Sequence, residues 1–256
     1  MKYDVKQCRI VEKKEIAKEI FSVIVEESFF AQQAVPGQFA QIYVPGKTLR
    51  RPISICDVDK ERGTLRFVFA IRGEGTAILA RQESGDTLDI LAPLGQGFHL
   101  GDTGRKVLFI GGGIGVPPLL YAARPFGENA TVVLGFRDAA TAILEEDFRR
   151  AGCRVIVFTE DGSAGRAGRV TGCFDELEGD AVFACGPHPM LQAVHRFAQQ
   201  RGIPAQVSLE ERMACGIGAC LGCACRVYKE DGEQETYAHV CKNGPVFDSR
   251  NIVWQG

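Results

Sequence analysis

Cysteine spacing in the last fifth of the sequence constrains the fold of this chain more than any other feature. Cys215, Cys220, Cys223 and Cys225 lie within eleven residues, and Cys241 follows sixteen residues later. A Cys-x4-Cys-x2-Cys spacing with a distant fourth cysteine is that of the plant-type ligand set of a [2Fe–2S] cluster. Small residues dominate between these cysteines, which suits a loop folded tightly around a cluster. We therefore predict a cluster-binding loop here.

Two other uses of cysteine fit the sequence less well. A structural zinc site usually has two Cys-x2-Cys pairs or a mixture of Cys and His, and here only Cys220 and Cys223 form such a pair. A disulfide framework is typical of short secreted chains, whereas charged residues rather than an apolar signal segment follow Met1. The cysteines outside the cluster segment are interpreted as buried free thiols; they are Cys8, Cys56, Cys153, Cys173 and, by default, Cys185.

Length and composition set the remaining limits. A chain of 256 residues with 45% hydrophobic content can form two domains of ordinary size and a small appendage. The formal net charge of -2 gives no reason to expect nucleic acid as a partner. No apolar run approaches the length of a membrane helix, so we expect no membrane insertion. A reducing cytoplasm fits the free cysteines best.

The first part of the chain has the pattern of short antiparallel strands. Apolar and polar residues alternate in several segments that are separated by turn residues, which is typical of an antiparallel sheet or barrel. The strand candidates are residues 20–25, 38–44, 64–70 and 87–91, and residues 75–82 have helical character instead. We predict a β-barrel domain over residues 1–100.

The pattern changes at Arg105, after a turn-rich boundary. A continuous apolar strand at residues 106–110 leads into a glycine run and a helix that extends to Arg124. Strands then alternate with helical patterns, which indicates a doubly wound α/β domain with a parallel sheet over residues 101–209. The later strand candidates are residues 131–136, 154–159, 180–185 and 205–209, and the helix candidates are residues 140–151 and 189–201. Residues 210–256 have little apolar periodicity and are expected to form a small domain that depends on its metal.

Two short motifs in the barrel domain have the chemistry of a phosphate-ligand site. Arg51 precedes Pro52 and is followed by Ile53 and Ser54, which places a fixed cation and a short hydroxyl side chain at the start of a strand. Residues 73–76 can present backbone amides to a pyrophosphate at the start of a helix. Taken alone, each motif is better explained by an exposed arginine or an ordinary helix start.

Two motifs in the α/β domain lie where ligands of such sheets bind. The glycine run at residues 111–115 lies between a strand and a helix, although Val116 replaces the third glycine of the dinucleotide-binding pattern. Pro117 and Pro118 suit the first turn of that helix. Cys185 and Gly186 follow the strand candidate at residues 180–185, and a small thiol there could lie beside a flat ring. Tight packing without a ligand is the alternative for both motifs.

The order of these motifs resembles the ferredoxin-NADP reductase superfamily. Together with the cysteine segment, the whole chain looks like the electron-transfer subunit of type 1B, NAD-linked dihydroorotate dehydrogenase. The segments that carry this resemblance are residues 51–54, 75–76, 111–118, 185–187, 208–220 and 244–247.

The resemblance implies three cofactor sites. The barrel domain would hold FAD, the α/β domain would bind NAD, and residues 210–256 would hold the [2Fe–2S] cluster. The implied FAD residues are Arg51, Pro52, Ile53, Ser54, Val68, Phe69, Ala70, Gly75 and Thr76. The implied NAD residues are Gly111, Gly112, Gly113, Gly115, Cys185 and Gly186. The implied cluster ligands are Cys215, Cys220, Cys223 and Cys241.

The resemblance also implies an activity and a partner. In the family, a catalytic subunit with FMN oxidises dihydroorotate to orotate in pyrimidine biosynthesis, and electrons pass through the cluster and FAD to NAD+. A heterotetramer with two copies of each subunit is expected. No acid–base residue on this chain is required for hydride exchange between flavin and nicotinamide, so we assign no catalytic residue.

Several alternatives stay open at this point. Cys225 competes with Cys241 as the fourth ligand. We favour Cys241 because ligands separated by one residue would strain a shared loop, and because the family that the chain resembles has its fourth ligand before the segment corresponding to residues 244–247. Arg137 could read a 2′-phosphate, so the sequence itself does not choose between NAD and NADP. The same domains also look like subunits that serve sulfite reductases, hydrogenases or ferredoxin-dependent transhydrogenases, and a non-enzymatic iron–sulfur module is a further hypothesis.

Overall fold

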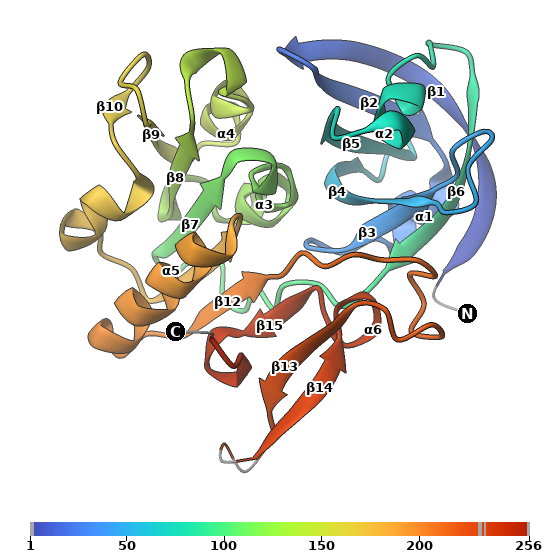
Figure 1. Cartoon of the computed structure of the whole chain (residues 1–256). Coiled ribbons are helices and arrows are strands. Elements are labelled where there is room, and N and C mark those ends of the chain that lie inside the picture. Colours follow the sequence, from blue (N-terminus) through green and yellow to red (C-terminus); the bar gives the residue numbers. More distant parts are fainter. Residues whose placement is uncertain (1–2, 230–231, 233, 255–256) are drawn as a thin grey trace.

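A closed barrel of antiparallel strands forms the first part of the protein. The computed structural model describes residues 3–229, 232 and 234–254. The barrel strands have the order β1-β2-β5-β4-β3-β6, and they form the blue and teal part of Figure 1. Their bounds are β1 Asp4–Ala17, β2 Ile20–Glu26, β3 Phe39–Ile42, β4 Arg51–Asp59, β5 Thr64–Ala70 and β6 Thr87–Leu94. Short helices α1 (Ser28–Gln33) and α2 (Glu74–Leu79) lie between strands.

Strand β1 closes the barrel. Its 14 residues pair with β2 along one part of their length and with β6 along another, both antiparallel. The first strand was not among the segments expected from the sequence, because charged side chains fill many of its outward positions. Cys8 and Ile10 are fully buried in the barrel core, whereas their neighbours Gln7, Arg9 and Val11 are partly or fully exposed. The alternation is therefore that of a strand with one face in water.

A seven-stranded sheet with the order β10-β9-β8-β7-β11-β12-β15 forms the second part. All neighbours in it pair in parallel except β15, which is antiparallel to β12. Helices α3, α4 and α5 pack beside it (Figure 1). The strands are β7 Val107–Gly112, β8 Ala130–Phe136, β9 Arg154–Thr159, β10 Arg166–Ala167, β11 Ala181–Cys185, β12 Ala205–Ser208 and β15 Val246–Asp248. The helices are α3 Pro117–Ala123, α4 Glu145–Arg150 and α5 His188–Arg201.

The helix expected over residues 140–151 is wrong in its first half. Residues 139–141 form a 3-10 turn, in which Asp138 and Thr141 bond each other's backbone N–H in a capping box. Leu144 then adopts a left-handed backbone conformation with φ 64°, and only Glu145–Arg150 continue as an α-helix. Local hydrogen bonds of Asp and Thr compete with the helical ladder, which explains the break.

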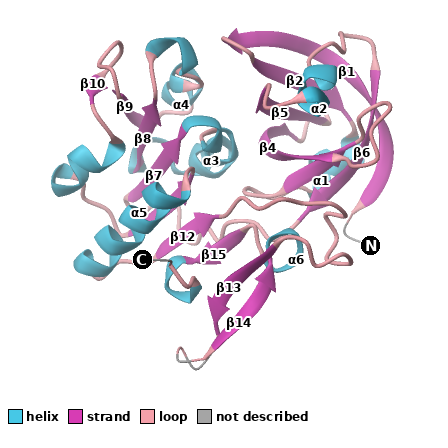
Figure 2. Cartoon of the chain, viewed as in Figure 1, coloured by secondary structure: helices cyan, strands magenta, loops and turns pink. Residues whose placement is uncertain are grey.

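The cysteine segment contacts both the barrel and the α/β sheet. After a loop that holds the first cysteines, β13 (Ala224–Tyr228) and β14 (Glu235–His239) form a hairpin, and α6 (Val240–Asn243) follows. Figure 2 shows the hairpin beside β12 and β15, in the space below the barrel and the α/β sheet. Strand β15 belongs to the C-terminal segment but pairs with β12 of the α/β domain. The C-terminal segment therefore supplies the edge strand of the α/β sheet.

Barrel and α/β domain share a buried contact. Ile20, Cys56 and Val68 of the barrel belong to the same apolar cluster as Phe109 and Phe183 of the sheet. Arg66 Nη1 donates to Asp147 Oδ1 at 2.6 Å across this border, and both side chains are less than a quarter exposed. The two domains are thus held in a fixed relation. Within the described residues, the structure has no helix long and apolar enough to cross a membrane.

Candidate cofactor sites

The first cavity opens where β4 begins and β5 ends. It has a volume of about 250 Å³ and brings together eight of the nine residues expected for FAD. Those eight are Arg51, Pro52, Ile53, Ser54, Val68, Phe69, Ala70 and Thr76. Strands β4 and β5 are neighbours in the barrel, so their ends reach one edge together. Gly75, the ninth residue, does not line the cavity.

Gly75 instead makes room for the Arg51 guanidinium. A Cβ on Gly75 would lie 2.4 Å from Arg51 Nε, so any other residue would displace this side chain. Arg51 Nη1 donates to the carbonyl of Leu49 at 2.7 Å, which fixes the guanidinium further. Among the residues that the structure describes, Arg51 has no salt bridge to a carboxylate. A held cation without an internal counter-ion fits a pyrophosphate, as the FAD prediction requires.

The opposite wall of this cavity comes from the α/β domain and the cysteine segment. Cys185 lies at the carboxyl end of β11, beside Ser208 of β12. Burial raises the pKa of the Cys185 thiol, so this small side chain is neutral. Sequence reasoning missed most of this wall because its members are distant in the chain. They are Ile114, Ser208, Leu209, Glu210, Glu211, Met213 and Pro245, and the barrel domain adds Phe39 and Arg72 to the lining of the cavity.

A close backbone contact connects the glycine run to this wall. A Cβ on Gly115 would lie 2.6 Å from both Cα and N of Gly186, so only glycine permits the approach. A Cβ on Gly112 would likewise lie 2.8 Å from Met190 Sδ. The helix α3 begins with Pro117 and Pro118, as the sequence predicts. The glycine run therefore serves packing as well as ligand access.

The second cavity, of about 570 Å³, lies at the carboxyl ends of the parallel strands. Gly112 and Gly113 line it, whereas Gly111 and Gly115 do not. Its other walls are Gly135, Phe136, Arg137, Glu160, Gly168, Arg169, Val170, Thr171, Pro187, Pro189, Met190 and Ala193. This is the position at which open α/β sheets bind nucleotides, and the size suits the larger part of NAD. Two arginines lie here, each with a carboxylate partner: Arg137 with Asp138, and Arg169 with Glu160.

The four cysteines expected as cluster ligands form two pairs. Cys223 Sγ and Cys241 Sγ are 3.2 Å apart, and the backbone N–H of Cys220 donates to Cys215 Sγ at 3.4 Å. No three His, Cys, Asp or Glu side chains of the described part of the chain converge as a single metal ion would require. Two cysteine pairs fit a cluster with two iron atoms, since each iron takes two protein ligands.

Backbone N–H groups surround the sulfurs. Ala219 and Cys220 donate to Cys215 Sγ at 3.3 and 3.4 Å, and Gly218 donates to Cys241 Sγ at 3.2 Å. Burial alone would raise the pKa of Cys215, but the N–H groups outweigh it and lower the pKa to about 6. The thiolate is the form that binds metal, so these N–H groups favour the ligating form of Cys215.

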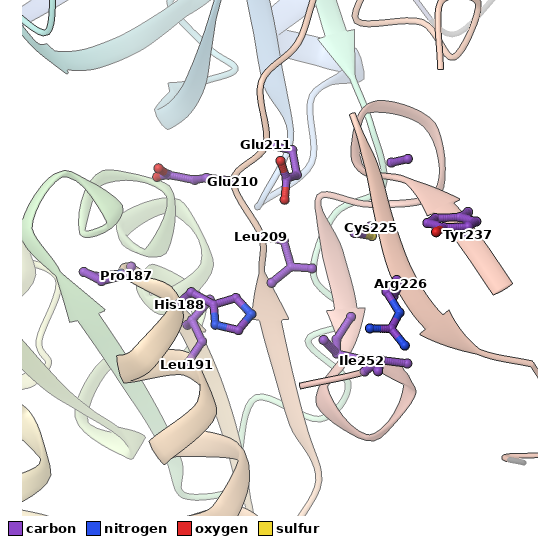
Figure 3. Close-up of a pocket in the computed structure, with 13 residues that line it drawn as sticks. Pro187, His188, Leu191, Leu209, Glu210, Glu211, Cys225, Arg226, Tyr237 and Ile252 are labelled. Atoms are coloured by element: carbon purple, nitrogen blue, oxygen red, sulfur yellow. The ribbon is translucent and has the colours of Figure 1, made fainter. Parts of the chain in front are cut away.

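Cys225 lies apart from these pairs. It belongs to β13 and lines a third cavity, of about 450 Å³, between the hairpin and the start of α5. Figure 3 shows Glu210 and Glu211 at one end of this cavity, with His188 and Arg226 on opposite walls. Burial and the Glu211 carboxylate raise the pKa of the Cys225 thiol to about 11. Its position supports Cys241 as the fourth ligand.

A flavin cavity, a nucleotide cavity and a cysteine-paired loop define a class of protein: a flavin and iron–sulfur reductase with the ferredoxin-NADP reductase fold. One similar solved structure is that of NADH-dependent reduced ferredoxin-NADP oxidoreductase, described for flavin-based electron bifurcation. Its sequence is 29% identical to this chain, and its TM-score is 0.83. The match covers 97% of this chain and 90% of that chain. The ferredoxin reductase of carbazole 1,9a-dioxygenase shares the fold, with 21% identity, a TM-score of 0.65, and coverage of 79% of this chain and 67% of that chain.

Sequence comparisons identify the family more closely. Residues 210–253 match the iron-sulfur cluster binding domain of dihydroorotate dehydrogenase B. A protein of Caldanaerobacter subterraneus subsp. tengcongensis named dihydroorotate dehydrogenase B (NAD(+)), electron transfer subunit, is 40% identical over 252 residues, which is 97% of this chain and 98% of that protein. Its namesake in Streptococcus mutans is 42% identical, with 95% and 96% covered. The chain belongs to this family of electron transfer subunits. The expected fold class and the three cofactors, FAD, an iron–sulfur cluster and NAD, are confirmed.

Proposed function

We propose that the protein transfers electrons from an FMN-containing catalytic subunit, which oxidises dihydroorotate to orotate, to NAD+. The cofactors on this chain supply two chemistries when bound, since a flavin exchanges hydride with nicotinamide and also exchanges single electrons with an iron–sulfur cluster. The residues of the chain bind these groups, hold them close together and exclude water. No proton transfer by a side chain is needed.

One observation carries the proposal: residues that line the flavin cavity lie within a few positions of the proposed cluster ligands and of the nucleotide-cavity wall. Met213 and Pro245 flank the proposed cluster ligands in sequence and line the flavin cavity, and Cys185 of the α/β domain lines it from the other side. Pro187, two residues after Cys185, lines the nucleotide cavity. A flavin in the first cavity would therefore lie between the cysteine loop and the nucleotide, which is the order that the electron relay requires.

Residue roles follow from these positions. We propose that Arg51 and Thr76 bind the FAD phosphates, with Arg51 held by Gly75. Residues 52–54 and 68–70 would lie along the flavin, and Gly112 and Gly113 would lie against the NAD phosphates. Cys185 and Gly186 would place the nicotinamide, because a small neutral thiol and a residue without a Cβ leave room for a flat ring. Cys215, Cys220, Cys223 and Cys241 are the proposed cluster ligands.

The cysteine loop also offers the surface for the catalytic subunit. Cys220 is exposed, and Ile217 and Leu221 beside it are 42% and 59% exposed although both are large apolar side chains. Leu221 has φ 61°, a backbone conformation that is unfavourable for leucine. Exposed apolar residues next to a redox site indicate a partner interface. We propose that the FMN subunit docks here, as two copies of each chain in a cytoplasmic heterotetramer.

Copurification and kinetics test the function. The chain would be expressed with an FMN-containing dihydroorotate dehydrogenase subunit, and dihydroorotate-dependent reduction of NAD+ would be measured. We expect activity in the complex, FAD and a [2Fe–2S] absorption spectrum on this chain, and two copies of each subunit by native mass. Leu221→Asp should weaken assembly and leave NADH-dependent ferricyanide reduction intact. A colourless zinc-binding chain, or a complex without this activity, would refute the proposal.

A second function is favoured by one observation, the 29% identity to the NADH-dependent reduced ferredoxin-NADP oxidoreductase over nearly the whole chain. In that case the partner would deliver electrons from ferredoxin. The same preparation decides between the two, because a transhydrogenase partner would give ferredoxin-dependent turnover and no response to dihydroorotate.

A further inference from the structure

Gln41 is a buried polar residue whose side chain has no hydrogen-bond partner. It lies in β3 and is 0% exposed. Neither Nε2 nor Oε1 of its carboxamide is hydrogen-bonded within the part of the chain that the structure describes. Burying a polar group without a partner is unfavourable, and buried carboxamides in folded proteins are nearly always bonded. The position therefore indicates that a bonding group is supplied by something other than the protein.

The direction of the side chain follows from the strand. Ala40 and Ile42 belong to the apolar core of the barrel, whereas Phe39 belongs to the apolar cluster that includes Cys223 and Cys241. Side chains alternate between the two faces of a strand. Gln41 therefore shares the face of Phe39, outside the barrel and toward the cysteine segment.

Contact with the cysteine loop is direct. A Cβ on Gly216, the residue after Cys215, would lie 2.6 Å from Gln41 Cγ and 2.8 Å from Nε2. Gly216 has φ 73°, so the loop passes over the Gln41 side chain in a conformation that glycine permits. Nε2, the donor end of the carboxamide, is among the three atoms nearest to this glycine, and Oε1 is not.

We propose that Gln41 Nε2 donates a hydrogen bond to a sulfur at the Cys215 end of the cluster and thereby raises its reduction potential. Cluster sulfurs are acceptors only, which matches the donor end of the amide. Hydrogen bonds to the sulfurs stabilise the reduced cluster, which carries one more negative charge, over the oxidised form. The inference rests on the proposed ligand set, and Gln41 acts as a positioning residue and not as a ligand.

The same strand connects this donor to the flavin cavity. Gln41 pairs with Pro52 in the β3–β4 ladder, and Pro52 and Phe39 both line that cavity. Gln41 is therefore a side-chain donor that reaches the cluster from the barrel, whereas the backbone donors at residues 218–220 belong to the cysteine loop itself.

The test is a redox titration of the holoprotein followed by EPR. Gln41→Met keeps length and shape and removes the donor. We expect the ratio of reduced to oxidised cluster at a fixed potential to fall about tenfold, a negative shift of about 59 mV for one electron. Gln206→Met is the control, because the Gln206 carboxamide in β12 already has partners at both ends, the backbone N–H and carbonyl of His99. That variant should leave the potential unchanged. An unchanged potential in Gln41→Met overturns the proposal.

A second measurement needs no stable variant. In wild-type protein labelled with ¹⁵N at glutamine side chains, pulsed EPR of the reduced cluster should show a nitrogen coupling as large as those from hydrogen-bonded backbone amides. Absence of that coupling would also overturn the inference. A wrong ligand set is distinguished from a wrong role for Gln41, since it would appear as a cluster that survives serine at Cys215, Cys220, Cys223 or Cys241.

Discussion

Adding one methyl group at Gly115 should damage NADH use without removing any cofactor. In Gly115→Ala the new Cβ would lie 2.6 Å from Gly186 Cα and N and 2.7 Å from the Cys185 carbonyl carbon. All three atoms are backbone, so no side-chain rotation can relieve the contact. The loop at residues 185–186 would have to retreat by about 1 Å to restore ordinary van der Waals separation.

The size of the effect follows from that displacement. Overpacking of this kind costs about 1–3 kcal/mol. If the strain falls on the NADH complex, kcat/KM for NADH decreases about 5-fold to 150-fold. The assay is NADH-dependent ferricyanide reduction, with FAD and iron content measured on the same samples. Gly172→Ala is the control, because its Cβ would meet only Phe158 Cε1 at 3.7 Å. A Gly115→Ala protein with wild-type kcat/KM would refute the role of this contact.

Three further perturbations test other parts of the structure. Cys225→Ser should keep the [2Fe–2S] EPR signal and Cys241→Ser should lose it, and the opposite result would exchange the fourth ligand. Burial raises the pKa of Glu210, partly offset by Arg72, so ionising this carboxyl weakens the fold as pH rises above its ordinary value of 4.5. Glu210→Gln should therefore raise the thermal midpoint at about pH 7 and not below about pH 4, and an equal shift at both would contradict this. Asp147→Asn leaves the half-buried Arg66 without its charge partner. This should lower the free energy of unfolding by about 1–3 kcal/mol, which is measured as a lower thermal midpoint. An unchanged midpoint would mean that the pair does not hold the domains together.

Periodicity predicted the regular elements well and the irregular ones poorly. Five strands of the α/β sheet, β7, β8, β9, β11 and β12, were expected within two residues of their observed ends, because buried parallel strands are continuous apolar runs. The two-residue strand β10 was not expected. The long strand β1 was missed, since its outer face is charged, and the helix over residues 140–151 was broken by local side-chain bonds near Asp138. Strand β15 could not be foreseen, because its pairing with β12 joins segments that are nearly forty residues apart.

Some residues of the candidate site could likewise be predicted from the sequence, and others could not. Motif residues such as Arg51 and Ser54 were predictable because their chemistry and their neighbours along the chain are both informative. Ile114, Ser208 and Met213 come from three segments that meet only in the folded structure. No local sequence pattern therefore predicts that they form one wall. Gln41 gave no signal either, since one glutamine in a strand is ordinary until its burial is known.

Strand β15 has a consequence for the order in which this protein matures. A ribosome makes β7, β8, β9, β11 and β12 before any cluster ligand, but β12 has an unpaired edge until residues 246–248 emerge. An open sheet edge is a site for wrong association with other chains. Only four residues separate Cys241 from Val246, so closing that edge and closing the ligand shell are nearly the same event. A shortage of iron during synthesis should therefore first become visible as aggregation of the nascent nucleotide domain.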